Sequence, residues 1–255
     1  MNVKTQITDF SKMKASCALC NLQELCLPRG LEADELEVLE KLVKRSRPLH
    51  RSDYIFRAGD SFKSLYAVRS GTVKVYTTTD LGEEQIMGFY FPGEIIGFDA
   101  IESDKHVCTA VALETSSYCA FTFEKLEEVS GEIPEVRRQI YRLMSRELSS
   151  DNQLLLTLSN KAAEEKIATF LLSLSGRFQR LGYSANEFKL AMSRQEIGNY
   201  LGMTIETVSR IFSKLQRKDI ISTNHKIIHI IDYPALENIC TGMNDDNKDQ
   251  SCIVA

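Results

Sequence analysis

The sequence predicts an α+β fold, with a small antiparallel roll or barrel of strands followed by a helical C-terminal half. Between Pro48 and about Phe123, short runs rich in Val, Ile, Tyr, Phe and Thr alternate with glycines, a pattern typical of short strands joined by turns. After Pro134, apolar residues recur at three- and four-residue steps, which is the periodicity of a helix. A chain of 255 residues is long enough for one large domain or two ordinary ones.

The composition excludes several classes of protein. Hydrophobic residues make up 43% of the chain and charged residues 26%, which are ordinary globular values and exclude wholesale disorder. No apolar run approaches the roughly 18–20 residues that a membrane span needs, and the N-terminus lacks the apolar segment of a secretory signal. We therefore expect a cytoplasmic protein without a membrane partner. The formal net charge of −4, taken alone, disfavours nucleic-acid binding through bulk charge.

The N-terminal segment, residues 1–30, contains three cysteines within ten positions. Cys17, Cys20 and Cys26 form a C-x2-C-x5-C run. The chain has seven cysteines, and an odd number in a cytosolic protein disfavours a disulfide framework. Clustered thiols can bind a soft metal ion or an iron–sulfur cluster, which would need a fourth ligand from elsewhere. Thiol redox chemistry and a purely structural role remain alternatives.

The next segment, residues 31–133, is expected to begin with a helix and to continue as the roll. Residues 31–45 place leucines at helical spacing among Glu and Lys, which predicts an amphipathic helix. The expected strands include residues 64–68, 72–76 and 85–89, each with β-branched or aromatic side chains and glycine nearby. Their spacing fits a small antiparallel roll.

A long helix is expected over residues 134–160. Its apolar stripe includes Ile140, Met144, Leu148 and Leu155, and Asp151 lies on the same stripe. The stripe is either an ordinary core face or the seam of a dimer, and its length and its place between two domains favour pairing with a second copy. Two Asp151 carboxylates that met across a two-fold seam would repel each other. A carboxylate at the edge of the stripe would instead be solvated.

Residues 161–240 contain the sharpest local motif, in which two helices are joined by a tight turn. Ser193 and Glu196 fit a capping box at the start of a short helix. Gly202 supplies the backbone freedom for a turn, and Thr204 is a good N-cap for the next helix. These offsets are typical of a helix-turn-helix.

The second helix of this motif presents three polar side chains on one face. Glu206, Ser209 and Arg210 stand three and four residues apart, so they share a face. In a DNA major groove Arg reads guanine, Glu accepts from cytosine, and Ser bonds either kind of base. The alternative is a surface ion pair between Glu206 and Arg210. Basic residues better placed for phosphate contacts follow along the helix: Lys214, Arg217 and Lys218.

The charge is unevenly distributed along the chain. Residues 1–158 hold 19 basic and 24 acidic side chains, residues 159–231 hold 11 and 6, and residues 232–255 hold 1 and 5. A basic segment therefore lies between an acidic body and an acidic end, which removes the objection to nucleic-acid binding. Residues 220–231 resemble the hairpin of a winged helix, and residues 241–255 are expected to form a flexible acidic tail.

Four passages of the sequence, taken together, resemble a known family. They are Leu65–Thr72 (LYAVRSGT), Ile96–Ile101 (IGFDAI), Ile197–Gly202 (IGNYLG) and Thr204–Arg210 (TIETVSR). With the cysteine-rich start, the roll and the long helix, they closely resemble the CRP/FNR family of bacterial transcription regulators. Within that family they resemble the oxygen-responsive FNR-type members, over nearly all of residues 15–240.

This resemblance implies a cofactor and its ligands. FNR-type proteins hold a [4Fe–4S] cluster on three N-terminal cysteines and on one at the far end of a roll of the cyclic-nucleotide-binding type. The matching residues here are Cys17, Cys20, Cys26 and Cys119. The cluster-loaded form would sense oxygen, pair through residues 134–160 as a homodimer and control anaerobic genes. The other cysteines have no such counterpart: Cys108, Cys240 and Cys252.

The resemblance also implies macromolecular partners and excludes one ligand. The dimer would bind a palindromic promoter site on double-stranded DNA, and the turn Asp80–Gly82 would contact RNA polymerase. The cyclic-nucleotide binders of the family carry Gly-Glu and Arg-Ser pairs in the roll. This chain has Gly97-Phe98 and, near the second place, Cys108-Thr109, so we expect no cyclic nucleotide.

Two other functions are compatible with parts of the sequence. A CRP-type regulator could use a structural zinc or a small-molecule signal in place of an oxygen-labile cluster. A redox enzyme could use the Cys17–Cys20 pair, but the βαβ pattern that would favour it is missing. Since no constellation of nucleophile and base is found either, we expect that the protein is not an enzyme.

Overall fold

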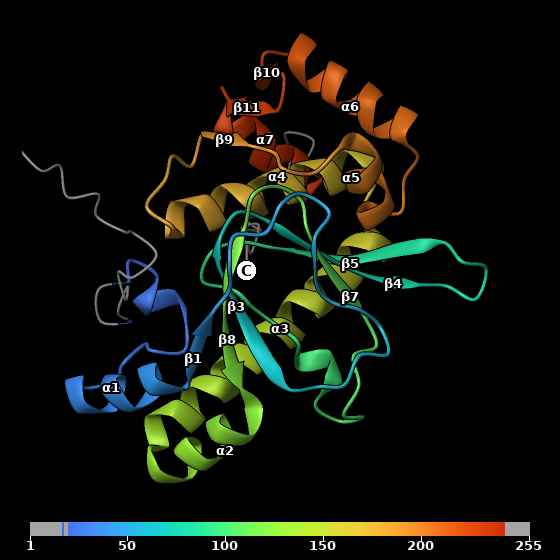
Figure 1. Cartoon of the computed structure of the whole chain (residues 1–255). Helices are drawn as coiled ribbons and strands as arrows, with labels where there is room; N and C mark the ends of the chain where they lie inside the picture. The colour runs from blue at the N-terminus through green and yellow to red at the C-terminus, as the bar shows by residue number, and fades with distance from the viewer. Residues whose placement is uncertain (1–16, 18–19, 243–255) are drawn as a thin grey trace, which may run out of the picture.

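The structure is a computed structural model of the chain, and it describes Cys17 and residues 20–242. The sequence expectations for residues 1–16, for Cys252 and for the acidic tail beyond Gly242 lie outside these residues. A β-roll occupies the centre of the molecule. Helices α1 and α2 lie at one end, helices α4 to α7 lie at the other, and α3 runs along the roll between them (Figure 1).

The roll consists of two antiparallel four-stranded sheets. Their strand orders are β1-β8-β3-β6 and β2-β7-β4-β5. The strands are β1 (Val43–Arg45), β2 (Tyr54–Phe56), β3 (Ser64–Ser70), β4 (Val73–Thr78), β5 (Glu84–Tyr90), β6 (Ile95–Ile96), β7 (Thr109–Ala112) and β8 (Ser117–Thr122). The inward side chains of both sheets, including Phe56, Val68 and Val75, form an apolar core. The expected roll and its three named runs are therefore confirmed.

Three helices frame the roll. Helix α1 (Ala33–Leu42) begins with a capping box between Glu32 and Glu35. Helix α2 (Phe123–Glu132) follows β8 directly and was not expected from the sequence. Helix α3 (Pro134–Asn160) starts with proline in its first turn, where the missing N–H leaves no bond unmade. Two short 3-10 helices, η2 (Gln23–Leu25) and η3 (Phe98–Ala100), lie in the loops.

The C-terminal part is a winged helix-turn-helix, which we call the reading head (α4 to α7). Its elements are α4 (Ala163–Arg180), β9 (Glu187–Lys189), α5 (Arg194–Leu201), α6 (Ile205–Arg217), β10 (Ile221–Asn224), β11 (Ile227–Ile230) and α7 (Tyr233–Thr241). The Ser193 hydroxyl accepts from the Glu196 N–H, the Thr204 hydroxyl caps α6, and Gly202 has φ +63°. These features confirm the sequence expectation. Strand β9, which extends the wing to three strands, and helix α7 were not expected.

The reading head and the roll share one apolar core. Ile197, Leu201 and Val208 pack within the head, and the same cluster of buried side chains includes Ile86 and Phe89 of the roll. The outer face of the sheet that contains β4 and β5 is therefore covered by the head (Figure 1). Among the described helices, none combines the length and the apolar character needed to cross a bilayer.

Candidate functional site

The four cysteines expected as ligands come from one loop and one strand. Cys17 is buried and Cys20, Cys26 and Cys119 are half-buried, and none of them forms a disulfide. The loop folds tightly, because the Cys20 N–H donates to the Cys17 carbonyl at 3.1 Å and the Cys26 N–H donates to the Leu22 carbonyl at 3.1 Å. Cys119 is fixed in β8 between its neighbours on β1 and β3.

The thiols lie within one another's electrostatic field. Burial raises the pKa of Cys26 to about 12, and the other three cysteines raise it as well. Burial also raises the pKa of Cys17, with Cys119 adding to the effect. Burial raises the pKa of Cys119 as well. Arg45 opposes the shifts of Cys17 and Cys119, because it hydrogen-bonds to both thiols and lowers their pKa values. Arg45 is the cross-strand neighbour of Cys119 in the β1–β8 pair.

The donor set suits a soft metal or an iron–sulfur cluster. All four groups are thiols, which such centres prefer, and a cation beside them favours the thiolate form that binds metal. In the described part of the chain, no three His, Cys, Asp or Glu side chains stand close enough together to hold a metal ion as they are. Three of the four thiols lie on a loop, so binding would require that loop to close onto Cys119.

The cysteine loop packs directly against the first half of α3. The Gln139 side chain is buried and donates to the Cys26 carbonyl at 3.2 Å. Leu27 and Leu31, which follow Cys26, share one apolar cluster with Val136 of α3. The cysteine loop is therefore in direct contact with α3.

The second half of α3 carries exposed apolar side chains. Leu148 and Leu155 are each 64% exposed, and Met144 is half-buried. Ile140 instead packs against the apolar cluster that the cysteine loop and helices α1 to α3 form with one face of the roll. Asp151 lies between the exposed leucines, and burial raises the pKa of its carboxyl group.

The recognition helix α6 presents its polar face to solvent. Glu206, Ser209 and Arg210 are all exposed, and Glu206 and Arg210 do not form the ion pair that was the alternative to base reading; the described ion pairs involve other residues. Hydrogen bonds from its own backbone N–H and from the Thr204 hydroxyl lower the pKa of Glu206.

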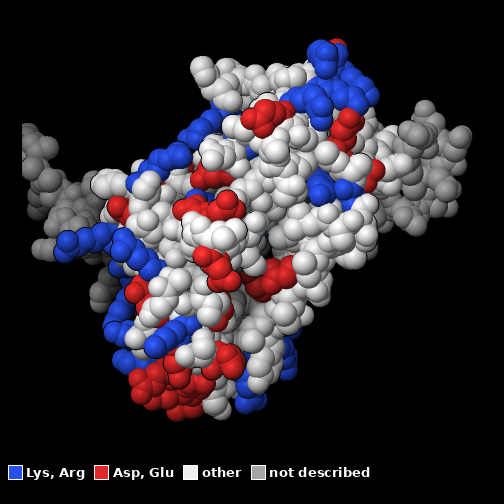
Figure 2. Space-filling view, turned by 90° about the vertical axis from the view of Figure 1, so that its right-hand side faces the viewer, with Lys and Arg blue, Asp and Glu red and all other residues white. Residues whose placement is uncertain are grey.

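The residues expected to contact phosphate divide into two groups. Arg217 and Lys218 are exposed, whereas Lys214 forms an ion pair with Glu164 of α4. Figure 2 shows a group of Lys and Arg side chains at the end of the molecule that carries α6 and a cluster of Asp and Glu at the opposite end, where Lys and Arg side chains also lie.

Comparison with known proteins agrees with this architecture. The Crp-like helix-turn-helix domain matches residues 165–239, and the cyclic nucleotide-binding domain matches residues 46–131. Transcriptional activator protein anr of Pseudomonas aeruginosa is 49% identical over 219 residues, which are 86% of this chain and 90% of that protein. The fumarate and nitrate reduction regulatory protein of Vibrio cholerae is 44% identical over 232 residues, covering 91% and 92%.

The chain belongs to the CRP/FNR family of transcription regulators. Its relatives include FNR-type activators, so the resemblance found in the sequence is confirmed, and these relatives are DNA-binding regulators rather than enzymes. The solved structure of FixK2 from Bradyrhizobium japonicum is similar to it with a TM-score of 0.71 at 29% identity, covering 77% of this chain and 96% of that chain.

In this CRP/FNR regulator the cyclic-nucleotide-binding domain provides the fold of the roll. At the position of the acid that binders carry, Phe98 packs against the apolar cluster that joins the cysteine loop and helices α1 to α3 to the roll. At the second position, Cys108 is half-buried and its N–H donates to Asp99 at 3.1 Å. Neither residue supplies a carboxylate that could accept hydrogen bonds from ribose hydroxyls or a cation that could pair with a phosphate.

Sequence reasoning identified Asp151 but missed the polar and charged residues that surround it at the junction of the roll, α3 and the reading head. A pocket there is lined by Tyr90, Glu147, Asp151 and Arg177, among others. Tyr90 donates to Glu147, and Arg177 donates to the Phe89 carbonyl at 2.7 Å. The sequence offered only a weak signal for the nearby contact of Lys74: strand alternation with Val73 and Val75 points this lysine away from the roll's interior, and only the structure shows that it is buried.

Proposed function

We propose that this protein is a cytoplasmic, oxygen-responsive transcription regulator that carries a [4Fe–4S] cluster on Cys17, Cys20, Cys26 and Cys119. The observation that supports this most directly is that the cysteine loop, which contacts α3, brings its thiols into the electrostatic field of Cys119, with Arg45 hydrogen-bonded to both Cys17 and Cys119. When bound, such a cluster would supply an oxygen-labile cross-link between the loop and the roll. Names among the relatives, such as the anaerobic regulatory protein of Pasteurella multocida, point to the same class of signal.

The protein's own residues would connect this cross-link to dimerisation. Gln139 and Val136 join the loop to α3 through a hydrogen bond and a shared core. An ordered loop holds the first half of α3, so that the exposed apolar face of the second half can pair with a second copy. The two Asp151 carboxylates oppose pairing, which keeps the dimer weak enough for loss of the cluster to reverse it.

The dimer would place two α6 helices in successive major grooves of a palindromic promoter site. Glu206, Ser209 and Arg210 are proposed to read bases, and Arg217 and Lys218 to contact phosphates. Lys214 could join them only by leaving Glu164. RNA polymerase is the proposed second partner, at the β4–β5 turn, where Leu81 is 88% exposed.

The visible spectrum and the iron and sulfide content of protein purified without oxygen test the proposal. We expect a brown protein with about four iron and four sulfide per chain, which bleaches in air. Single Cys→Ser changes at Cys17, Cys20, Cys26 or Cys119 should abolish the colour. Cys108→Ser is the matched control and should keep the colour, because Cys108 is not one of the four proposed ligands.

Two outcomes would contradict the proposed cofactor. A colourless protein containing one zinc per chain would indicate a structural metal site instead. A colourless, metal-free anaerobic protein that still binds its DNA site would indicate a regulator controlled by another signal.

A further inference from the structure

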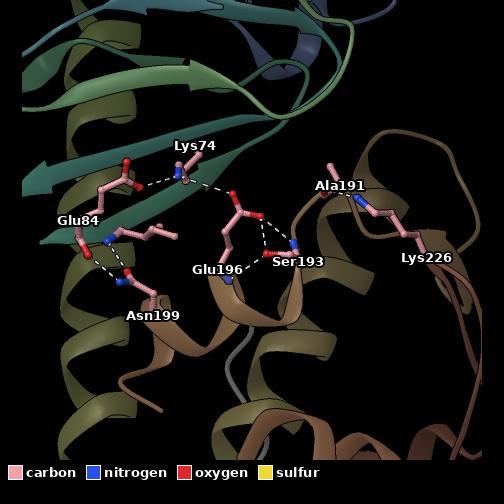
Figure 3. Close-up of polar contacts among 8 residues, drawn as sticks. Lys74, Glu84, Ala191, Ser193, Glu196, Asn199 and Lys226 are labelled. Carbon is pink, nitrogen blue, oxygen red and sulfur yellow. Dashed lines mark hydrogen bonds and ion pairs between the residues drawn. The ribbon is translucent and has the colours of Figure 1, made fainter. Parts of the chain in front are cut away.

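Helix α5 is attached to the roll along the free edge of β5. Strand β5 is the last strand in its sheet, so one row of its backbone groups lacks a strand partner. The Asn199 side chain supplies that partner, because it accepts from the Ile86 N–H at 2.7 Å and donates to the Glu84 carbonyl at 2.6 Å. In return the Gln85 amide donates to the Asn199 carbonyl at 3.2 Å. Figure 3 shows Asn199 reaching the strand from the end of α5.

A buried lysine fixes the other end of the same helix. The side chain of Lys74 is only 10% exposed and lies 2.9 Å from the Glu84 carboxylate and 3.6 Å from that of Glu196. Glu196 also accepts from the Ser193 N–H at 2.7 Å, so the acid that closes the capping box is the one that Lys74 holds (Figure 3). Removing Lys74 would leave the Glu196 carboxylate, whose side chain is only 17% exposed, without its cationic partner, although Ser193 would still donate to it.

An aromatic contact and a further hydrogen bond also join the reading head to the roll. The rings of Phe89 and Tyr200 meet at 5.3 Å between centroids, and Arg177 donates to the Phe89 carbonyl from α4. The covalent connection, by contrast, is short, because α3 ends at Asn160 and α4 begins at Ala163. Such a junction is where a hinge would operate, and the contacts of Lys74 and Asn199 oppose its movement.

These contacts leave the reading face open. Glu206, Ser209 and Arg210 on α6 are exposed while α5 is docked, so the docked state is compatible with DNA binding. A contact that blocked DNA binding by covering the reading head would have to cover this face of α6.

We propose that Lys74 and Asn199 are positioning residues that lock each reading head to its own roll. They thereby fix the separation and angle of the two α6 helices in the dimer. The inference rests on the palindrome-binding dimer proposed above. It goes further, because it makes two residues that do not contact DNA responsible for the dimer's preference for one half-site spacing. Since one base pair displaces a half-site by about 3.4 Å and rotates it about the duplex, a locked head should tolerate little change in spacing.

The experiment compares spacing variants of one duplex. The site is the palindrome that the anaerobically purified, full-length dimer selects from a random duplex pool, and it is then remade with one or two base pairs inserted at its centre. We expect the native protein to bind the selected spacing much more tightly than either insertion. Asn199→Ala and Lys74→Met should lose about tenfold in affinity for the selected spacing and should bind the three duplexes within about threefold of one another.

Matched controls and readouts separate positioning from folding. Asn238→Ala on α7 and Lys105→Met on the roll remove exposed side chains of the same kinds and should keep the native discrimination. Sedimentation verifies that each variant is a dimer, and thermal unfolding verifies that each head is folded. A merely unstable head would lose affinity for all three duplexes in parallel.

Three results would overturn the inference. The first is an equal loss of affinity for all three duplexes. The second is that both variants keep the native preference for the selected spacing. The third is that the variants bind DNA more tightly than the native protein, which would make the contact inhibitory. If the native protein selects no palindrome, the proposed function itself fails, and that result is distinguishable because it precedes any variant.

Discussion

Arg210 and Arg217 lie on the same helix but are expected to act differently on DNA. Arg210→Ala should cost about 1–3 kcal/mol on the selected site and relax the preference at one base pair, because a bidentate contact to a base edge is lost. Arg217→Ala should weaken binding to all sequences alike and lower the salt dependence, as loss of a phosphate contact does. Affinities on a panel of single-base variants check both. If Arg210→Ala weakened binding to all sequences equally, Arg210 would instead be a contact to the phosphate backbone of the DNA.

Asp151 is expected to govern the monomer–dimer equilibrium. Asp151→Asn should strengthen the dimer in air by about 1–4 kcal/mol, because two like charges no longer meet at the seam. Pairing would raise an Asp151 pKa that burial already raises, so the dimer binds more protons than the monomer. The native dissociation constant should therefore fall as the pH drops through these raised values, and the Asn variant should lack this dependence.

Sedimentation at several pH values tests the Asp151 prediction. Asn152→Ala is the control, since it alters the neighbouring exposed position without changing charge. An aerobic Asp151→Asn protein that stays monomeric would show that repulsion does not set the equilibrium.

At the scale of elements, the helix-turn-helix depends on close contact between α5 and the turn. A Cβ added to Gly198 would lie 2.6 Å from the Met203 carbonyl oxygen, which belongs to the backbone and cannot move alone. Gly198→Ala should therefore destabilise the reading head by about 1–3 kcal/mol and reduce DNA binding. Gly131→Ala in α2 meets nothing within 4 Å and should stabilise the protein by about 0.5–1 kcal/mol. Chemical denaturation measures both, and equal effects would contradict the packing explanation.

Element by element, the sequence predicted most of this fold because the signals are local. Ser193, Thr204 and Gly202 define the ends of α5 and α6 through bonds to residues within four positions. Helix α2 was missed because it follows β8 directly, with no side-chain cap to mark its start. Helix α7 was missed although Asp232 caps it and Pro234 lies in its first turn. Strand β9 has three residues and exists only through its pairing with β11.

At the scale of the whole molecule, oxygen should change association more than folding. The cores of the roll and the reading head consist of apolar side chains, so loss of a cluster from the loop should leave the far-UV circular dichroism nearly unchanged. Sedimentation should nevertheless show conversion of dimer to monomer. Asp151→Asn, bleached in the same way, should remain dimeric. A large loss of helical signal on bleaching would show that the cluster supports the fold itself.

The sequence by itself determined the order of the parts, the ends of the reading helices and the cluster of three N-terminal thiols. These follow from spacing along the chain, where hydrogen bonds and helical periodicity act over a few residues, whereas Cys119 was identified only through the family resemblance. Only the tertiary structure decided that Ile140 faces its own roll while Leu148 and Leu155 face solvent, and that Lys214 is held by Glu164. It also decided that Lys74 and Asn199 join the head to the roll. Such pairings connect segments about 50 to 120 positions apart, and they form because two apolar faces pack together and bury the polar groups that lie between them.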